Sequence, residues 1–266
     1  MSPPTNPLQF TILGCGNSTG VPAVTNHWGD CDPNEPKNRR RRSSIAVQDT
    51  QSGNTLIIDT GPDFREQMND HNITQINGVL YTHEHADHMH GIDDLRFYRF
   101  KQGDLIPTFM SQTTMDAIRG HFGYMFDGGN WDIYKPILTP NIVKFGEKHS
   151  CSGIDFIPFA QDHGSCISTG YRFGELAYSV DLITLDDTAI ETLKGIKTWI
   201  VDAAGYHNEN NKVHATIENI IALNDRIGAE TIYLTSLSLG MDYKTLCDEL
   251  PSHIKPCYDG LVVQSV

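Results

Sequence analysis

The stretch 83–88 constrains this 266-residue chain more than any other part of its sequence. Residues 78–82 have the pattern of a short buried strand, and four possible metal ligands follow it: His83, His85, Asp87 and His88. Residues two apart in an extended chain point to the same side, so we expect His83 and His85 to face one site. Imidazole and carboxylate groups are the ligands that Zn²⁺, Mn²⁺ and Fe²⁺ prefer. The HxHxDH motif therefore predicts a metal site, and the alternative, a solvated histidine-rich loop, is disfavoured.

The hydrophobic pattern predicts strands in the first part of the chain and alternating helices and strands in the last third. We expect strands at 8–13, 44–47, 55–59, 78–82, around Pro107, and at 142–145, 154–159, 167–173, 176–180, 198–202, 231–234 and 261–263. We expect helices at 62–71, 88–100, 112–122, 186–193, 215–226 and 243–250. This order fits two packed sheets with helices outside. No repeat or linker divides the sequence, so we predict a single domain over residues 1–266.

The charge balance limits the partners of the chain. Asp and Glu number 33 against 20 Lys and Arg, which gives a net charge of −13. Binding along a nucleic acid depends on Lys and Arg side chains that displace counterions from the phosphates. Because acidic residues are in excess, we expect no stable nucleic-acid partner. The sequence has no run of 18 apolar residues, and its first residues lack the basic and apolar regions of a secretory signal. The six cysteines show no CxxC spacing. We therefore predict a cytoplasmic protein without a membrane segment.

HxHxDH after a short strand resembles the signature of the metallo-β-lactamase superfamily. Further stretches are similar to the branch that contains phosphoribosyl 1,2-cyclic phosphate phosphodiesterase, beside RNase Z: residues 13–22, 58–65, 90–96, 242–243 and 258–260. The resemblance extends from about residue 8 to residue 263. It implies an α/β (α+β) fold, a four-layer αββα sandwich with the metals at the edge between the sheets.

The resemblance also implies which residues hold one or two divalent ions, Zn²⁺ or Mn²⁺. The first site would use His83, His85 and His163, the second Asp87 and His88, and Asp181 would bridge the two. Taken without the motif, His163 and Asp181 would be ordinary loop residues. Together with the motif, and at the ends of predicted strands, we assign them as ligands.

One position departs from the family pattern. The alignment places Ser238 where the family has its last metal-ligating histidine, and no histidine lies between His214 and His253. A neutral hydroxyl is a poor ligand for these metals beside imidazole. The second site is therefore expected to bind its ion more weakly than the first.

Two residues are candidates for catalysis, His214 and Asp87. His214 matches a further active-site histidine of the family, which stabilises charge or protonates the leaving oxygen. The alternative is that His214 caps the helix predicted from residue 215. Asp87 would act as a ligand of the second metal. In addition, Asp59 lies at a predicted strand end, from which it is expected to orient a ligand histidine.

These assignments favour a metal-dependent phosphodiesterase that acts on a small cyclic or nucleotide-like phosphodiester, because two adjacent metals suit that reaction. One alternative is a degenerate homologue that binds a metal or nucleotide without efficient turnover. Another is an RNase Z-like endonuclease for tRNA 3′ ends, but the segment 91–140 lacks a long Gly/Pro-rich extension that could form a substrate-gripping arm. A homodimer is left open. The run Arg39–Arg42 could cradle a phosphate, although pairing with surface carboxylates is favoured.

Overall fold

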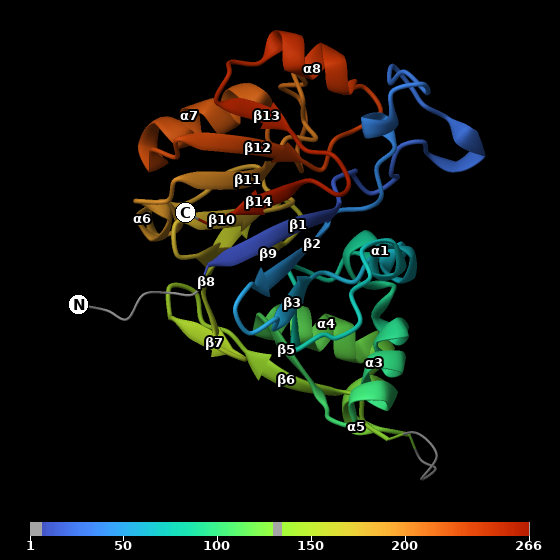
Figure 1. Cartoon of the computed structure of the whole chain (residues 1–266). Helices are drawn as coiled ribbons and strands as arrows, with labels where there is room; N and C mark the ends of the chain where they lie inside the picture. Colours follow the sequence, from blue (N-terminus) through green and yellow to red (C-terminus); the bar gives the residue numbers. More distant parts are fainter. Residues whose placement is uncertain (1–6, 130–134, 266) are drawn as a thin grey trace.

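The computed structural model describes residues 7–129 and 135–265, and over these residues fourteen strands form two seven-stranded sheets (Figure 1). The first sheet has the order β14 (Val262–Gln264), β1 (Leu8–Gly14), β2 (Ser44–Asp49), β3 (Thr55–Ile58), β4 (Gly78–Leu80), β5 (Ile106–Met110) and β6 (Leu138–Ile142). The second has the order β13 (Ile254–Pro256), β12 (Thr231–Thr235), β11 (Thr198–Asp202), β10 (Leu176–Ser179), β9 (Ile167–Phe173), β8 (Ile154–Asp162) and β7 (His149–Cys151).

The helices fall into two groups along the chain. The first group contains α1 (Phe64–Asp70), α2 (Ala86–Met89), α3 (Leu95–Gln102), α4 (Gln112–Phe122) and α5 (Tyr124–Asp127). The second contains α6 (Asp187–Leu193), α7 (Ile217–Ile227) and α8 (Tyr243–Glu249). Short 3₁₀ helices are η1 (Val24–Asn26), η2 (Pro36–Asn38) and η3 (Ile92–Asp94). In Figure 1, α1, α3, α4 and α5 lie beside the first sheet, whereas α6, α7 and α8 lie beside the second.

Apolar side chains form three buried layers between these elements. Leu80 of the first sheet and Ile200 of the second belong to one cluster, which joins the two sheets. The neighbouring residue Val79 packs with the helices of the first group, and Trp199 packs with those of the second. Successive strand residues point to opposite faces, so a strand buried on both faces is continuously apolar. The predicted αββα sandwich is thereby confirmed.

The structure corrects several element boundaries. The helix predicted at 88–100 is broken, because α2 ends at Met89 and α3 begins at Leu95. The strand predicted at 142–145 lies earlier, at β6, an edge strand that tolerates Pro140. The apolar pattern misled the prediction here, since Ile142 and Phe145 remain 41% and 40% exposed. The hydrophobic pattern did not predict the short strands β7 and β13 or the helix α5.

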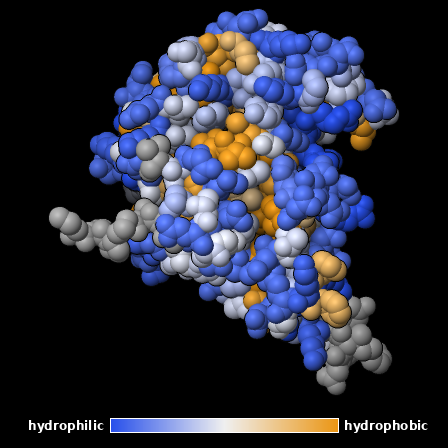
Figure 2. All heavy atoms as spheres, in the orientation of Figure 1, coloured by the Kyte–Doolittle hydropathy of each residue, from blue (hydrophilic) through white to orange (hydrophobic). Residues whose placement is uncertain are grey.

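The surface in the view of Figure 2 is mostly hydrophilic, with separate apolar patches between the charged side chains. Among the described residues, no helix combines the length and the apolar character needed to cross a membrane. Residues 1–6, on which the expectation about a secretory signal partly rests, lie outside the described residues.

Candidate metal centre

The candidate ligands gather because several strands end at the same edge of the sandwich. In the second sheet, β8 is antiparallel to β9, and β9 is antiparallel to β10, so β8 and β10 run in the same direction. Their carboxyl ends carry His163 and Asp181. In the first sheet, the chain leaves β4 toward His83 and His85. The carboxyl ends of neighbouring strands are the usual place for a ligand in such sheets.

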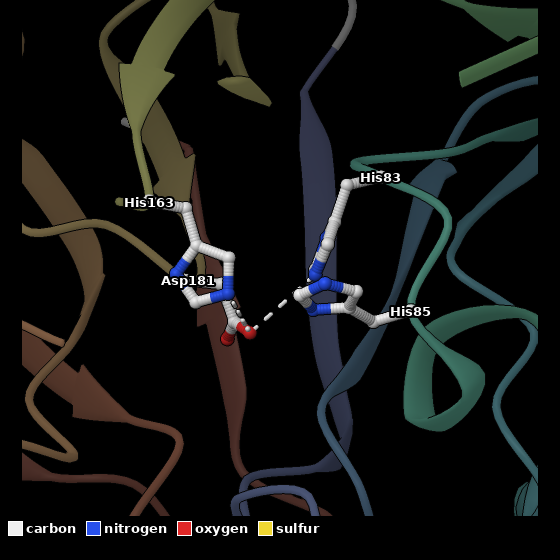
Figure 3. Close-up of side chains that lie close together, drawn as sticks. All are labelled: His83, His85, His163 and Asp181. Atoms are coloured by element: carbon white, nitrogen blue, oxygen red, sulfur yellow. Dashed lines mark ion pairs between the residues drawn. The ribbon is translucent and has the colours of Figure 1, made fainter. Parts of the chain in front are cut away.

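The first cluster contains one ligand atom from each of His83, His85, His163 and Asp181, and these atoms lie within 4.8 Å of one another (Figure 3). Asp181 Oδ2 is 3.6 Å from His83 Nε2 and 3.3 Å from His163 Nε2. His83 and His163 are buried, whereas His85 is partly exposed. The structure thus brings together the three histidines that the family resemblance assigned to one site.

The second cluster contains Asp87, His88 and Asp181, again with ligand atoms within 4.8 Å. His88 Nε2 is 3.3 Å from Asp87 Oδ2 and 3.4 Å from Asp181 Oδ2. Asp181 is therefore common to both clusters, as expected of a carboxylate that bridges two ions. Its backbone is left-handed, with φ of 55°, a strain that is concentrated at functional sites in folded proteins.

Hydrogen bonds at Nδ1 of His163 and His88 turn the Nε2 atoms of these two histidines toward Asp181. His163 Nδ1 donates to the carbonyl of Val213 at 2.6 Å, an oxygen that can only accept. His88 Nδ1 donates to Asp59 Oδ2 at 2.8 Å, so Asp59 orients a ligand histidine as predicted. His83 Nε2 is buried without any hydrogen-bond partner. A buried lone pair without a partner is costly, and this donor set fits a divalent metal that binds Nε2.

The pKa values show how the protein compensates charge around Asp181. Burial lowers the pKa of His83 well below its ordinary value, and the neighbouring His88 lowers it further. Burial also lowers the pKa of His163. Burial opposes a charge on His88 as well, but the carboxylates of Asp181 and Asp59 raise its pKa well above the ordinary value. The carboxylates of Asp181 and Asp59 therefore favour a positive charge in this pocket, and a bound metal ion would supply it.

A third group, which the sequence analysis recognised only in part, joins His214 to Asp202 and Asp181. His214 Nδ1 donates to Asp202 Oδ2 at 2.7 Å. Burial disfavours the charged imidazole, but the Asp202 carboxylate raises the pKa of His214 to about 9. Asp202 is fully buried at the end of β11. Asp202 was not identified from the sequence. The feature that could have identified it is an acidic residue at the end of an apolar strand, which is the feature that identified Asp59.

His214 does not cap a helix. The helix α7 begins at Ile217 rather than at residue 215, and its N-cap is Thr216, whose side chain accepts from the backbone of Asn219. His214 instead lies beside His163, with ring centroids 5.3 Å apart. The imidazole of His214, held by Asp202, therefore lies next to the first cluster.

Close backbone packing fixes the loop that carries the second cluster. A Cβ atom on Gly61 would lie 2.2 Å from the carbonyl oxygen of Asp87, and one on Gly91 would lie 2.2 Å from the carbonyl of Gly61. Neither contact is compatible with a larger residue unless the backbone moves. Gly61 and Gly91 are therefore required where the segment after β3, the helix α2 and the turn after α2 approach one another around Asp87.

The strand register bears on the expected last ligand. Ser179 pairs with Val201, and Val201 pairs with Leu234. Two residues beyond these positions lie Asp181 and Ser236, both with φ of 55°. Ser236 is buried, and its hydroxyl is 3.1 Å from that of Ser43. The register therefore places Ser236, and not Ser238, at the level of Asp181.

Ser238 lies in the turn beyond this strand end, where its carbonyl accepts from Arg40 Nη1 at 3.4 Å. The arginine run itself diverges, and its four side chains contact Trp28 (from Arg39), Asn38 (from Arg40), Asp70 (from Arg41) and Asp63 (from Arg42). The favoured pairing with carboxylates is confirmed for Arg41 and Arg42. Arg40 is instead buried, with only 2% exposed, against neutral oxygens.

Comparison with known proteins agrees with this geometry. A family model described as a β-lactamase superfamily domain matches residues 54–235. A crystal structure of a diphosphatase from the PhnP family is 31% identical, with a TM-score of 0.86, and the match covers 97% of both chains.

The chain is a PhnP-family member of the β-lactamase superfamily. The metal-dependent hydrolase predicted from the motif is confirmed at this level.

More distant structures show the same fold as this PhnP-family chain. Zn²⁺-bound PqqB from Methylobacterium extorquens has a TM-score of 0.73 at 17% identity, over 96% of this chain and 99% of that one. Human tRNase Z, short form, has a TM-score of 0.67 at 14% identity, over 96% and 98%. At these identities the likeness concerns the fold.

A curated relative from Porphyromonas gingivalis, named octanoyltransferase, is 32% identical over 255 residues. The match covers 96% of this chain but 51% of the relative, so the chain spans about half the length of that protein. The name describes the relative as a whole.

Proposed function

We propose that this chain hydrolyses a small cyclic or nucleotide-like phosphodiester. The observation that carries the proposal is the pair of His/Asp clusters that share Asp181 at the sheet edge. Two adjacent divalent ions in such clusters lower the pKa of a bound water and offset negative charge on a phosphate. His83, His85 and His163 would hold the first ion and Asp87 and His88 the second, with Asp181 between them.

In this proposal His214 gives a proton to the departing alkoxide. Its Nδ1 donates to Asp202, and the Asp202 carboxylate raises the pKa of His214 to about 9, so that near neutral pH the imidazole is protonated and its other nitrogen carries the proton that the leaving oxygen needs. The loop that precedes α7 holds both His214 and Val213, and the carbonyl of Val213 orients His163. The acid and a ligand of the first cluster are therefore held by the same segment.

The charge of the chain supports a small substrate rather than a polynucleotide. A net charge of −13 gives long-range repulsion toward a phosphate backbone, while the bound ions would attract a single phosphate group locally. The name of the PhnP-family relative favours a second candidate, hydrolysis of a diphosphate. The cytoplasmic location, the homodimer and the identity of the ions as Zn²⁺ or Mn²⁺ stay predictions.

The proposed function predicts metal-dependent turnover of a simple diester. Purified protein should contain between one and two divalent ions per chain, and a chelator should abolish hydrolysis of bis(p-nitrophenyl) phosphate. Activity should return on addition of Mn²⁺ or Zn²⁺. Elemental analysis and the release of p-nitrophenol measure the two quantities.

Three outcomes of this experiment favour the alternatives. Absence of turnover with either ion favours a degenerate binding homologue. Faster hydrolysis of a nucleoside diphosphate ester than of any diester favours the diphosphatase. Cleavage of precursor tRNA at physiological salt favours the RNase Z-like endonuclease.

The weaker second site that the sequence predicts leads to a further prediction. In our proposal Ser236, rather than Ser238, stands where the family has its last histidine ligand, because it lies at the level of Asp181. Ser236→His should raise the affinity for the second ion, and a histidine tolerates the φ of 55° at this position better than a β-branched residue would. Zn²⁺ titration against a chromophoric chelator measures the change.

Ser238→His is the matched control, because it adds the same side chain two residues farther along. Its carbonyl contact with Arg40 uses the backbone and is retained. The expected result is unchanged stoichiometry for Ser238→His and tighter second-ion binding for Ser236→His. The opposite result would show that Ser238 occupies the ligand position.

A further inference from the structure

Thr82 lies between His83, a ligand of the first cluster, and Asp59, the buried carboxylate that orients His88 in the second cluster. Its hydroxyl donates to Asp59 Oδ2 at 2.7 Å and is 2.9 Å from His83 Nδ1. The backbone N–H of Thr82 donates to Asp59 Oδ1 at 2.8 Å. Thr82, Asp59 and His83 are each 0% exposed. Water is therefore excluded from these contacts, and the three groups must satisfy one another.

The proton positions follow from the numbers of donors and acceptors. Asp59 Oδ2 receives two contacts, one from Thr82 and one from His88 Nδ1 at 2.8 Å. A hydroxyl has one proton, and the proton of Thr82 is used toward this carboxylate. The oxygen of Thr82 then presents a lone pair to His83, so Nδ1 of His83 must carry the hydrogen. His83 Nε2 is left deprotonated, and this is the buried atom without a partner.

We infer that the Thr82 hydroxyl, which donates to Asp59 and accepts from His83, connects the two residues, so that one buried carboxylate orients a ligand histidine in each cluster. Asp59 contacts His88 directly, whereas its hydrogen-bonded connection to His83 runs through Thr82. Thr82 is thus a positioning residue for the first site. The inference rests on the metal centre proposed above and is independent of which ester the enzyme hydrolyses.

The threonine side chain suits this role for a physical reason. Its hydroxyl donates and accepts at the same time, and its branched Cβ restricts the rotamer that points the oxygen between the two partners. Valine has nearly the same shape and lacks the hydroxyl. Thr82→Val therefore removes the connection, leaves the backbone bond to Asp59 intact and does not touch His88.

The test measures tautomers and metal affinity separately. In metal-free protein, ¹⁵N NMR of the imidazoles should find His83 as the Nδ1–H tautomer in the wild type. Thr82→Val should lose this fixed tautomer at His83 and leave the ¹⁵N shifts of His88 unchanged, and Thr82→Ser should behave as the wild type. Asp59→Asn should disturb both histidines. The affinity of the first Zn²⁺, measured by chelator competition, should fall about 10- to 100-fold in Thr82→Val, as for other partners of metal ligands.

Thr169→Val is the matched control. The hydroxyl of Thr169 is buried without a hydrogen-bond partner, and its backbone N–H donates to the carbonyl of Thr82 at 2.9 Å. This substitution removes the same group from a residue of β9 that contacts the backbone of Thr82, without breaking a hydroxyl contact. It should change neither the tautomer of His83 nor the affinity for Zn²⁺.

Either of two results would overturn the inference. One is a Thr82→Val protein that retains the His83 tautomer and binds Zn²⁺ within about twofold of the wild type. The other is a loss in Thr169→Val equal to that in Thr82→Val, which would indicate a packing effect. If Thr82→Val does not fold, a loss of the tautomer in Thr82→Ser overturns the inference, and its retention there together with loss in Thr82→Ala supports it. A wild-type protein that binds no Zn²⁺ would refute the metal centre, and the tautomers would still decide the role of Thr82.

Discussion

Asp181→Asn is expected to reduce the affinity for the second ion by more than about 100-fold, because even the partners of metal ligands are worth about 10- to 100-fold. Asp181 belongs to both ligand clusters, and its Oδ2 lies within 3.6 Å of His83, His88 and His163. Asparagine keeps the shape of the side chain and tolerates the left-handed backbone. It removes the charge on which both clusters depend. Hydrolysis of bis(p-nitrophenyl) phosphate should fall at least in proportion.

The measurements are Zn²⁺ or Mn²⁺ titration and steady-state turnover at saturating metal. Asp187→Asn serves as the control, because the side chain of Asp187 is 93% exposed and pairs with Arg226 on the surface. Thermal unfolding of the metal-free proteins separates a binding defect from a folding defect. Two tightly bound ions in Asp181→Asn would contradict the assignment of a shared ligand.

His214→Ala is expected to lower kcat by about 10²- to 10⁴-fold for a diester with an alkyl leaving group, the range typical of a lost general acid. The loss should be much smaller for a p-nitrophenyl leaving group, because nitrophenolate departs without a proton. Metal content should be unchanged, since the two clusters retain all their proposed ligands. Comparing kcat for the two leaving groups measures the effect.

Asp202→Asn should also lower kcat selectively for the diester with an alkyl leaving group, by a smaller factor than His214→Ala. Asp202 does not reach the leaving group in this proposal, and it acts by holding Nδ1 of His214 at 2.7 Å. A general loss of stability would slow both substrates alike, so the ratio between the leaving groups identifies a positioning role. Equal losses on the two substrates in both variants would exclude His214 as the acid.

The local sequence sufficed for the residues of the HxHxDH motif. His83, His85, Asp87 and His88 leave one strand end within six residues, so their convergence needs little help from the rest of the fold. His163, Asp181 and His214 were assigned through the family resemblance, because each lies in a loop of ordinary composition. Their proximity depends on strands far apart in the chain that end at one edge.

Two assignments around the site, Asp202 and Ser236, come from the tertiary structure. Asp202 looked like the polar end of a strand, and only its contact with His214 reveals its place. The sequence predicts Ser238 as the position of the last ligand, whereas we propose Ser236, because the pairing of β11 with β10 and β12 places it at the level of Asp181. A shift of two residues keeps the same strand face, so the periodic pattern could not distinguish these serines.

The sequence by itself determined the ligand chemistry and the layered fold, because apolar periodicity and the spacing of histidines are local properties of the chain. The tertiary structure decided how these groups are connected. Asp59 reaches His83 through Thr82, Asp202 holds His214, and Asp181 serves both clusters. Such contacts depend on register and on the approach of separate loops within a few ångströms, and a linear pattern of residue types does not encode those distances.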